Sequence, residues 1–157
     1  MVKKSYQIQT EGRQKKRAMA MMKNKPISRK YTVEIISHIK GKRVDKSLTW
    51  LEKITKMEEF LPLRKYIKKI GHRKGDSKAN TKVGRYPIRT VKAIMELLES
   101  VKANADYKGL DSENLLITHM FASEGFTRAS YQSQGRIAGK RRANKSTHVE
   151  IIVEEAR

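Results

Sequence analysis

The chain has 157 residues, of which 36 are Lys or Arg and 16 are Asp or Glu, giving a formal net charge of +20. This length fits one domain. The absence of Cys excludes disulfides, thiolate metal sites and Cys catalysis. No uncharged apolar run approaches the roughly 18 residues of a membrane span, and the polar N-terminus predicts no secretory signal. Because the charge far exceeds what solubility requires, we expect a cytoplasmic protein with a polyanionic partner.

The positive charge is concentrated in three segments. Residues 1–30 and residues 61–90 each carry a net charge of +9, whereas residues 31–60 and 91–120 are close to neutral. Residues 128–145 contain six basic side chains and no acidic one. Solvated loops rarely exclude acids over such a length, so this last segment is the strongest candidate for binding a polyanion.

The chain begins with a polar segment and a predicted strand. Residues 1–12 contain few apolar residues and are expected to form a disordered or extended tail. A single domain is expected over residues 13–157. Residues 13–25 fit either a strand or a short helix by periodicity, and the abrupt end at Pro26 favours a strand.

Two helices are predicted next. Ser28 is the expected N-cap of the first, which ends at Gly41, and Asp45 is the expected N-cap of the second. Apolar residues recur at helical spacing on one face of each segment. These residues are Tyr31, Ile35 and Ile39 in the first helix, and Val44, Leu48, Leu51 and Ile54 in the second.

The middle of the chain predicts a short helix, a loop and a long helix. Pro62 could occupy the first turn of a short, very basic helix that runs through Ile70. Residues 71–86 are rich in Gly and in Lys or Arg and lack apolar periodicity, so they predict a loop. Pro87 opens the most regular helix of the chain, which closes between Asn104 and Gly109, with Ile88, Val91, Met95 and Leu98 on its core face.

The last third of the chain changes to a period of two. Asn114–Ser123 and Thr147–Glu154 predict strands rich in β-branched residues. In the second run the side chains of Val149, Ile151 and Val153 point one way. The side chains of His148, Glu150 and Glu154 point the other way and suggest a polar face.

The segment of about 124–146 between these strands is too long for a structureless loop in a compact domain. The economical alternative is that the strands continue into one extended antiparallel hairpin with its tip near Gln134. At about 3.3 Å per residue, such an arm reaches about 65 Å from Asn114. Most of it cannot pack on this core, so we expect it to be buried in a partner, and its charge indicates nucleic acid.

No catalytic or metal-binding motif emerges from the sequence. Glu34 and His38 share a helix face, but no HExxH motif accompanies them. His119 and His148 could be cross-strand neighbours and could bind a metal only with further ligands, so we interpret them as part of a polar strand face. Gly71-His-Arg-Lys-Gly75 lacks the spacing of a phosphate-binding Walker A loop. We therefore expect no enzyme activity and no cofactor or metal.

Nucleic-acid binding is the chemistry that the sequence favours. Lys and Arg neutralise phosphates and release counterions, so affinity scales with the number of contacts. No helix-turn-helix, zinc-finger, heptad, RNP1 or KH motif is present. RNA is favoured over DNA because long basic extensions with small residues suit an irregular folded target. Within the positive segment of residues 61–90, further candidate cations are Arg64, Lys65, Lys68 and Lys69. The predicted RNA-binding residues are Arg13, Lys15, Lys16, Arg17, Lys23, Lys25, Arg29, Lys30, His72, Arg73, Lys74, Lys78, Lys82, Arg85, Arg89, Arg128, Gln132, Gln134, Arg136, Lys140, Arg141, Arg142 and Lys145.

Four short motifs, in this order and at this spacing, resemble a known family. They are Gly71-His-Arg-Lys-Gly75, Gly84-Arg-Tyr-Pro87, Ala103-Asn-Ala-Asp-Tyr-Lys-Gly-Leu-Asp111 and His148-Val-Glu-Ile-Ile-Val-Glu-Glu155. Ser123-Glu-Gly125 also resembles the start of the family's extended hairpin. The family is the universal large-subunit ribosomal protein twenty-two family in its archaeal form, which is protein seventeen in eukaryotic nomenclature.

The resemblance implies a fold and a function. The implied fold is α+β, with three helices packed on a three-stranded antiparallel sheet and a long protruding hairpin. The implied function is a structural one in the large subunit: binding ribosomal RNA, supporting assembly and lining the nascent-peptide tunnel with the hairpin, as a monomer among neighbouring ribosomal proteins. One departure stands out, because Tyr131-Gln132-Ser133 occupies the positions where the family usually has Pro-Arg-Ala, ahead of Gly135-Arg136.

Two other functions remain open from the residues alone. One is a free-standing nucleic-acid-binding protein that acts in chromatin or in translational control. The other is a metal-dependent RNA-processing enzyme that uses His119, His148 and a carboxylate. The hairpin is further predicted to be unordered before assembly, because an isolated ribbon without a packed face is marginal in water.

Overall fold

The computed structural model describes residues 5–8, 16–66, 69–75 and 81–156. The strand predicted near the N-terminus, the two strands predicted in the last third of the chain and three of the four predicted helices are present. In chain order the elements are β1 (Arg17–Lys25), α1 (Arg29–Ile39), α2 (Val44–Thr55), β2 (Leu61–Pro62), β3 (Gly84–Arg85), α3 (Ile88–Tyr107), a 3-10 turn (Ser112–Asn114), β4 (Leu115–Tyr131) and β5 (Arg141–Glu155).

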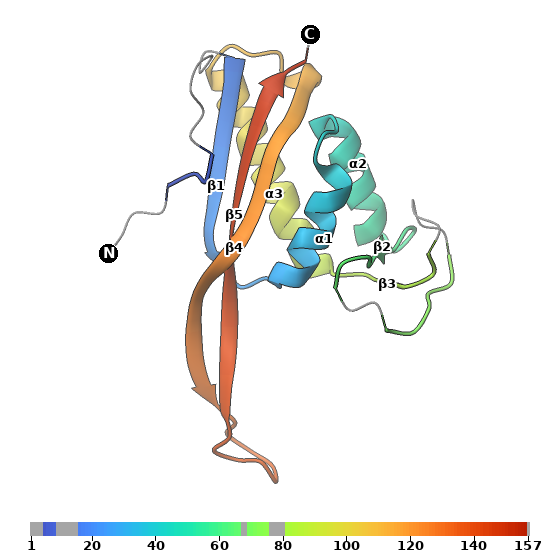
Figure 1. Ribbon diagram of the computed structural model, residues 1–157, viewed down its shortest axis with the longest axis vertical. Helices are drawn as coiled ribbons and strands as arrows, with labels where there is room; N and C mark the ends of the chain where they lie inside the picture. Colours follow the sequence, from blue (N-terminus) through green and yellow to red (C-terminus); the bar gives the residue numbers. More distant parts are fainter. Residues whose placement is uncertain (1–4, 9–15, 67–68, 76–80, 157) are drawn as a thin grey trace.

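A three-stranded antiparallel sheet carries the helices on one face (Figure 1). The strand order is β1-β5-β4, so the C-terminal strand lies in the centre. α3 packs against β1, α1 packs against β4, and α2 packs on α3. This arrangement confirms the α+β fold that the family resemblance implied.

The core lies between the sheet and the helices. Ile35 and Ile39 of α1, Leu98 of α3, and Ile117 and Ile151 of the sheet are fully buried. Val149 and Val153 are buried on the same face as Ile151, which confirms the predicted period of two in this strand. Burial of these side chains is what holds the three helices on the sheet.

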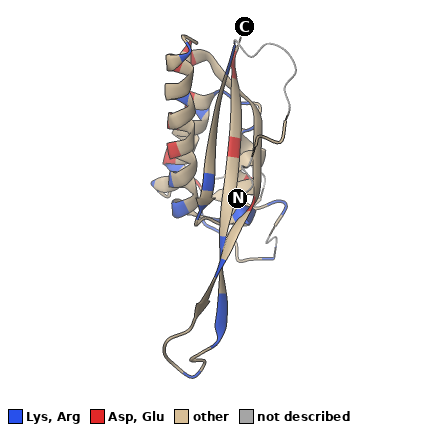
Figure 2. Cartoon of the chain, turned by 90° about the vertical axis from the view of Figure 1, so that its left-hand side faces the viewer, with Lys and Arg blue, Asp and Glu red and all other residues tan. Residues whose placement is uncertain are grey.

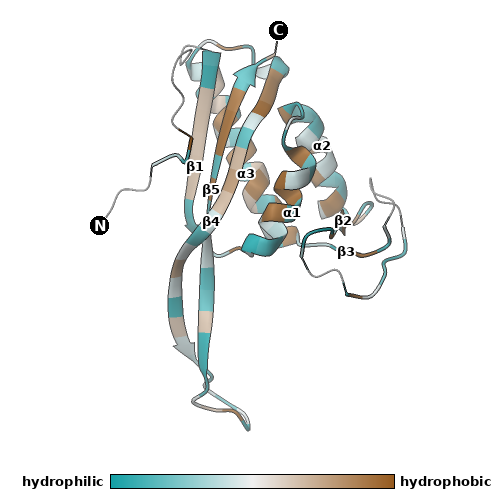
Figure 3. Cartoon of the chain, in the orientation of Figure 1, coloured by the Kyte–Doolittle hydropathy of each residue, from teal (hydrophilic) through white to brown (hydrophobic). Residues whose placement is uncertain are grey.

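β4 and β5 continue beyond the core as one hairpin, as the loop-length argument predicted. The same two strands pair along their whole length, from Leu115 opposite Glu155 to Tyr131 opposite Arg141, with two bulges on the way. Figure 1 shows the far half of this ribbon projecting from the end of the sheet, away from all three helices. Figure 3 shows that the projecting half lacks the concentrated hydrophobic positions of the body.

Two β-bulges divide β4. The first lies between Ile117 and His119 and turns His119 away from the helices, so that it pairs with Ile152 of β5. At this point the turn after α1 joins the sheet edge: the Gly41 N–H donates to the Ile117 carbonyl over 2.9 Å. Gly41 has a φ of +78°, which favours glycine, and this confirms it as the residue that ends α1. The second bulge lies between Glu124 and Thr127, where the hairpin leaves the sheet.

The predicted N-caps have different outcomes. Ser28 occupies the N-cap of α1 as predicted, but its side chain makes no capping hydrogen bond. The prediction that Asp45 caps α2 is wrong, because the cap is Arg43. Asp45 lies inside the first turn instead, where its carboxylate pairs with the Lys102 ammonium of α3 over 2.8 Å. A carboxylate there complements the positive end of the helix as well as Lys102.

The short helix predicted from Pro62 to Ile70 is also wrong. Pro62 lies in β2, which pairs with β3, and the described residues between Pro62 and Ile70 contain no helix. The buried carboxylate of Glu34 explains why: it accepts the backbone N–H groups of Arg64 over 3.2 Å, Lys65 over 2.7 Å and Tyr66 over 2.6 Å. These three groups are therefore satisfied by a side chain from α1, and the segment is held as a loop against it.

The face of the sheet away from the helices is partly covered, contrary to the polar face predicted for β5. Glu150 is only 2% exposed, and Ile152 beside it is buried. The Gln7 backbone N–H donates to the Glu150 carboxylate over 3.1 Å, so part of the predicted tail lies on this face. Burial and the nearby Glu150 carboxylate raise the pKa of Tyr6. Tyr6 and Gln7 therefore lie beside this face of the sheet, at Glu150.

Candidate nucleic-acid interface

The hairpin presents its cations to solvent without acidic partners. All six basic side chains of the 128–145 segment are exposed, and within the described residues none of them makes an ion pair. Figure 2 shows basic residues on this ribbon and no acidic ones near its free end. The six are Arg128, Arg136, Lys140, Arg141, Arg142 and Lys145. Like charges this close repel one another, so the ribbon favours a polyanionic partner.

The pairing register sorts these side chains onto two faces. Residues directly opposite each other share a face of the ribbon. Tyr131 lies opposite Arg141, and Thr127 lies opposite Lys145, on the face that continues the helix side of the sheet. Ser130 lies opposite Arg142, and both residues share the opposite face of the ribbon with Arg128. Both faces therefore carry cations, which suits a ribbon surrounded by its partner.

The tip of the hairpin is closed by its own hydrogen bonds. The Gln132 N–H donates to the Lys140 carbonyl over 3.0 Å, and the Gln132 side-chain amide donates to the Gln134 carbonyl over 3.1 Å. Gln132 is thus used partly to shape the tip. Gln134, Arg136 and Lys140 remain exposed.

Several cations of the N-terminal cluster are paired with acids of the body. Lys25 lies 3.0 Å from Glu96, and Arg29 lies 3.2 Å from Glu124. Arg17 pairs with Glu154, and Lys16 lies 3.9 Å from Glu155. Lys23 and Lys30 are exposed and make no ion pair among the described residues. A phosphate must compete with a carboxylate at the paired cations, so Lys23 and Lys30 are the better candidates. Arg13 and Lys15 lie outside the described residues.

The basic residues between positions 64 and 89 lie in the segments around β2 and β3 and at the start of α3. Arg64, Lys65, Lys69, His72, Arg73, Lys74, Lys82 and Arg89 are exposed. Arg85 is half-buried, and its guanidinium donates to the carbonyls of Gly71 over 3.2 Å and Gly84 over 3.0 Å. His72 forms a bridge with Val83, so part of the predicted loop is a short ladder. Lys68 and Lys78 lie outside the described residues.

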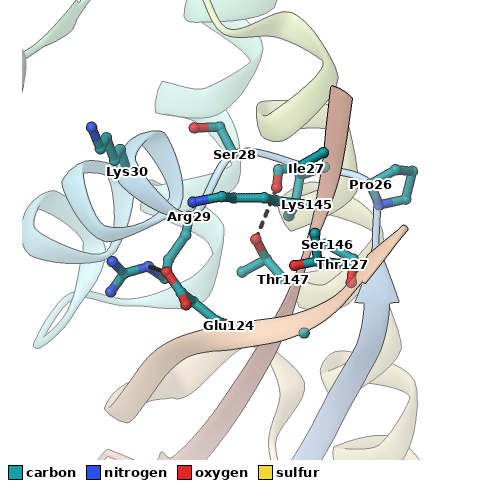
Figure 4. Close-up of a pocket in the computed structure, with 12 residues that line it drawn as sticks. Pro26, Ile27, Ser28, Arg29, Lys30, Glu124, Thr127, Lys145, Ser146 and Thr147 are labelled. Atoms are coloured by element: carbon teal, nitrogen blue, oxygen red, sulfur yellow. Dashed lines mark hydrogen bonds and ion pairs between the residues drawn. The ribbon is translucent and has the colours of Figure 1, made fainter. Parts of the chain in front are cut away.

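A groove of about 470 Å³ lies where the hairpin leaves the body (Figure 4). It is lined from one side by the start of α1 and from the other by the hairpin. The side chains of Arg29, Lys30 and Lys145 line it together with the hydroxyl-bearing Ser28 and Thr127. Glu124 lines the same groove and pairs with Arg29, so Lys30 and Lys145, from two separated segments of the chain, are the cations left there for a phosphate group.

A network of side chains fixes the base of the hairpin beside this groove. The Asn24 carboxamide oxygen accepts the Phe126 N–H over 3.0 Å, and the Ser146 hydroxyl donates to the Phe126 carbonyl over 2.6 Å. Gly125 leaves no space for a side chain: an added Cβ would lie 2.6 Å from the Ser146 hydroxyl oxygen and 2.8 Å from the Asn24 oxygen. We call Asn24, Gly125, Phe126 and Ser146 the base lock.

Sequence reasoning missed the base lock and the anchoring role of Glu34. Ser123-Glu-Gly125 marked where the hairpin starts, but no pattern signalled that Asn24, about a hundred positions earlier in the chain, holds the same point. The φ of +51° at Asn24 is tolerated by asparagine better than by most residues, and this is visible only in the structure. Glu34 looked like a helix-face partner of His38.

The metal-enzyme alternative loses its geometric basis. His119 and His148 are not cross-strand neighbours, because His119 lies opposite Ile152 and His148 lies opposite Ser123. The His119 ring nitrogen instead lies 3.0 Å from the Glu150 carboxylate. Within the described residues, no group of three or more His, Cys, Asp or Glu side chains could hold a metal ion. No helix among those residues is long and apolar enough to cross a membrane.

The fold and the cation distribution define a class of protein: a small α+β body that carries a basic, coreless hairpin suited to a polyanionic partner. Comparison with known families makes this specific. The family model described as ribosomal protein L22p/L17e matches residues 20–154, and the chain belongs to this family.

Relatives from several archaea support the assignment. A protein of Methanocaldococcus jannaschii called large ribosomal subunit protein uL22 is 38% identical over 155 residues, covering 99% of this chain and 97% of its own length. Proteins of the same name from Ignicoccus hospitalis and Archaeoglobus fulgidus are each 37% identical, covering 89% and 88% of this chain and the same shares of their own lengths. The expectation of the family and of its archaeal form is thereby confirmed.

Proposed function

We propose that this protein is a structural constituent of the large ribosomal subunit that binds large-subunit ribosomal RNA and acts without catalysis in the cytoplasm. The observation that carries the proposal is the hairpin: six exposed cations, none of them ion-paired among the described residues, on a ribbon that has no core of its own. Family membership supports the large subunit as the place where such a ribbon finds its phosphates.

The finer contacts form part of the same proposal. The hairpin helps to line the nascent-peptide tunnel, and the body contacts RNA through Lys23, Lys30, Arg73, Lys74 and Arg89 near neighbouring ribosomal proteins. Residues 13–157 act as one domain, preceded by the polar segment 1–12. The partner of the groove at the hairpin base is a backbone phosphate held by Lys30 and Lys145. The predicted set of RNA-binding residues remains a prediction throughout.

The free-standing nucleic-acid-binding protein is the alternative that the experiment must exclude. Cell extract is sedimented through a sucrose gradient at high salt, and the protein is quantified in each fraction against a large-subunit marker. We expect stoichiometric co-migration with large subunits, since a ribbon embedded in folded RNA is retained when surface contacts are screened. Migration at the top of the gradient would overturn the proposal. Equal affinity of the purified protein for duplex DNA would favour the alternative.

The salt dependence of free binding gives a second test. If six to ten phosphates are neutralised, the affinity of the purified protein for large-subunit RNA falls by about 10³ to 10⁵ between about 50 and about 200 mM salt. The slope of log affinity against log salt counts the contacts. A flat slope would show that the cations do not bind phosphates.

A further inference from the structure

Two aromatic rings stand out on the hairpin because the described residues leave most of their surface uncovered. Phe126 is 65% exposed and Tyr131 is 69% exposed. A large ring in water forgoes the favourable transfer from water that the core side chains gain, and the hairpin offers no second layer against which either ring could pack. Neither residue is a cation, so phosphate binding does not account for them.

The backbone at Phe126 is held on both sides. Its N–H is accepted by Asn24 and its carbonyl accepts from Ser146, so two side chains from other strands fix the position from which the ring projects. Gly125 is packed against the same two side chains. A ring presented from a constrained backbone loses little conformational entropy when it meets a partner.

The two rings lie at opposite ends of the projecting ribbon. Tyr131 is the last residue of β4 and lies directly opposite Arg141. Phe126 lies in the second bulge, between the pairs Glu124–Thr147 and Thr127–Lys145, and Arg128 follows it two residues later. Each ring therefore has exposed cations close by in the ribbon, and within the described part of the hairpin from Arg128 to Lys145 there is no acidic residue.

We propose that Phe126 and Tyr131 are stacking platforms for unpaired bases of the bound RNA, one at the base of the hairpin and one near its tip. A ring beside cations is the combination that binds single-stranded RNA: the cations hold the phosphates and the ring takes the π-face of a base. A ring meant for an apolar protein partner would be expected within an apolar patch, whereas these two lie among Arg, Lys, Ser and Thr. The inference rests on the proposed function and adds base contacts to its phosphate contacts.

The test separates stacking from charge. The affinity of the full-length protein for a short unstructured single-stranded RNA is measured across a salt series for the wild type, Phe126→Leu and Tyr131→Leu. Leucine keeps an apolar side chain and removes the ring. We expect each variant to bind about fivefold to a hundredfold more weakly at every salt concentration, with the slope of log affinity against log salt unchanged.

Two matched variants complete the series. Tyr131→Phe keeps the ring and is expected to bind as the wild type does. Arg128→Gln removes one phosphate contact, so the slope is expected to fall by about 0.7. Because Phe126, Arg128 and Tyr131 are exposed, none of these changes should alter the thermal midpoint, which is recorded for each variant.

The possible failures are distinguishable. Unchanged affinity in both leucine variants, with a steep salt slope retained, would overturn the stacking proposal and leave the proposed function standing. A flat slope in the wild type would overturn the proposed function itself. In assembled subunits, ultraviolet cross-links from Phe126 and Tyr131 to nucleotides support the proposal. Cross-links from these rings to another protein instead would overturn it.

Discussion

β4 and β5 each run through two regions of the molecule with opposite surroundings. In the body, residues 149–153 of β5 are all buried, with the helices on one face and Gln7 hydrogen-bonded to Glu150 on the other. In the hairpin, residues 141–145 of the same strand are all exposed. The same two strands pair on both sides of the bulge between Glu124 and Thr127, so secondary structure alone does not distinguish the regions. What differs is whether the side chains are buried by this chain or left for a partner.

The same contrast holds for charge. In the body, cations such as Arg17, Lys25 and Lys102 are matched by carboxylates. In the hairpin they are not, among the described residues. These cations of the body are therefore neutralised within the chain, whereas those of the hairpin depend on phosphates. Substitutions in the buried core should change stability and leave RNA affinity little changed, and substitutions of the hairpin cations should do the reverse.

The largest effect is expected from the body. Leu98→Ala removes a fully buried side chain of α3 and leaves a cavity, so the free energy of unfolding should fall by about 2 to 5 kcal/mol in chemical denaturation. The matched change in the hairpin, Arg142→Ala, should alter stability by less than about 0.5 kcal/mol. Equal losses in the two variants would show that the hairpin shares the stability of the core.

Glu34→Ala tests the anchor of the loop that follows β2. Three backbone N–H groups lose their acceptor, and we expect a loss of about 3 kcal/mol in the free energy of unfolding. Glu58→Ala, at an exposed position, serves as the control and should cost little. A negligible effect of Glu34→Ala would show that water replaces the carboxylate freely.

Gly125→Ala tests the junction between the two regions. The added Cβ would press on Ser146 and Asn24, so we expect a loss of about 1 to 3 kcal/mol and weaker incorporation of the protein into large subunits. Gly71→Ala is the matched control, because an added Cβ there has no neighbour within 4 Å. If both variants assemble equally well, the base lock does not set the path of the hairpin.

The smallest effect is expected from His38. Burial lowers the pKa of this imidazole below its ordinary value of 6.5, with the nearby Arg64 and Lys42 acting in the same direction and the Pro62 carbonyl and Glu34 opposing. Since protonation is easier in the unfolded chain, stability from this group is present above pH 6.5 and declines as the pH falls through the lower folded-state pKa.

A pH titration of unfolding checks this sign. The free energy of unfolding of the wild type should decrease more between about pH 7.5 and about pH 5.5 than that of His38→Phe. His72→Gln, at an exposed position, should follow the wild type. A steeper decrease in His38→Phe than in the wild type would contradict the direction of the shift.

Local patterns predicted most of this fold. Period-two runs gave the cores of β4 and β5, apolar stripes gave α1, α2 and α3, and the loop-length argument gave the hairpin. The failures came from contacts that no local pattern contains. Pro62 permits a helix start, but Glu34 captures the following backbone groups from α1. A bulge after Ile117 changes which residue of β5 His119 meets.

The candidate site divides in the same way. The unpaired state of the hairpin cations follows directly from composition, because basic side chains in a stretch without acidic residues have no ion-pair partner within that stretch. The pairing of Arg29 with Glu124 and of Lys25 with Glu96 could not be read from the sequence, since both depend on the tertiary fold. The exposure of Phe126 and Tyr131 likewise became apparent only once the ribbon was seen to have no covering layer.

Hydrogen–deuterium exchange, residue by residue, on the free protein and on assembled large subunits tests the central claim most directly. The account predicts that amides of the core strands are protected in both, while amides of residues 127–145, beyond the base lock, exchange rapidly in the free protein and become protected in the subunit. Protection of residues 127–145 in the free protein equal to that of the core would contradict it, because the hairpin would then be stable without RNA.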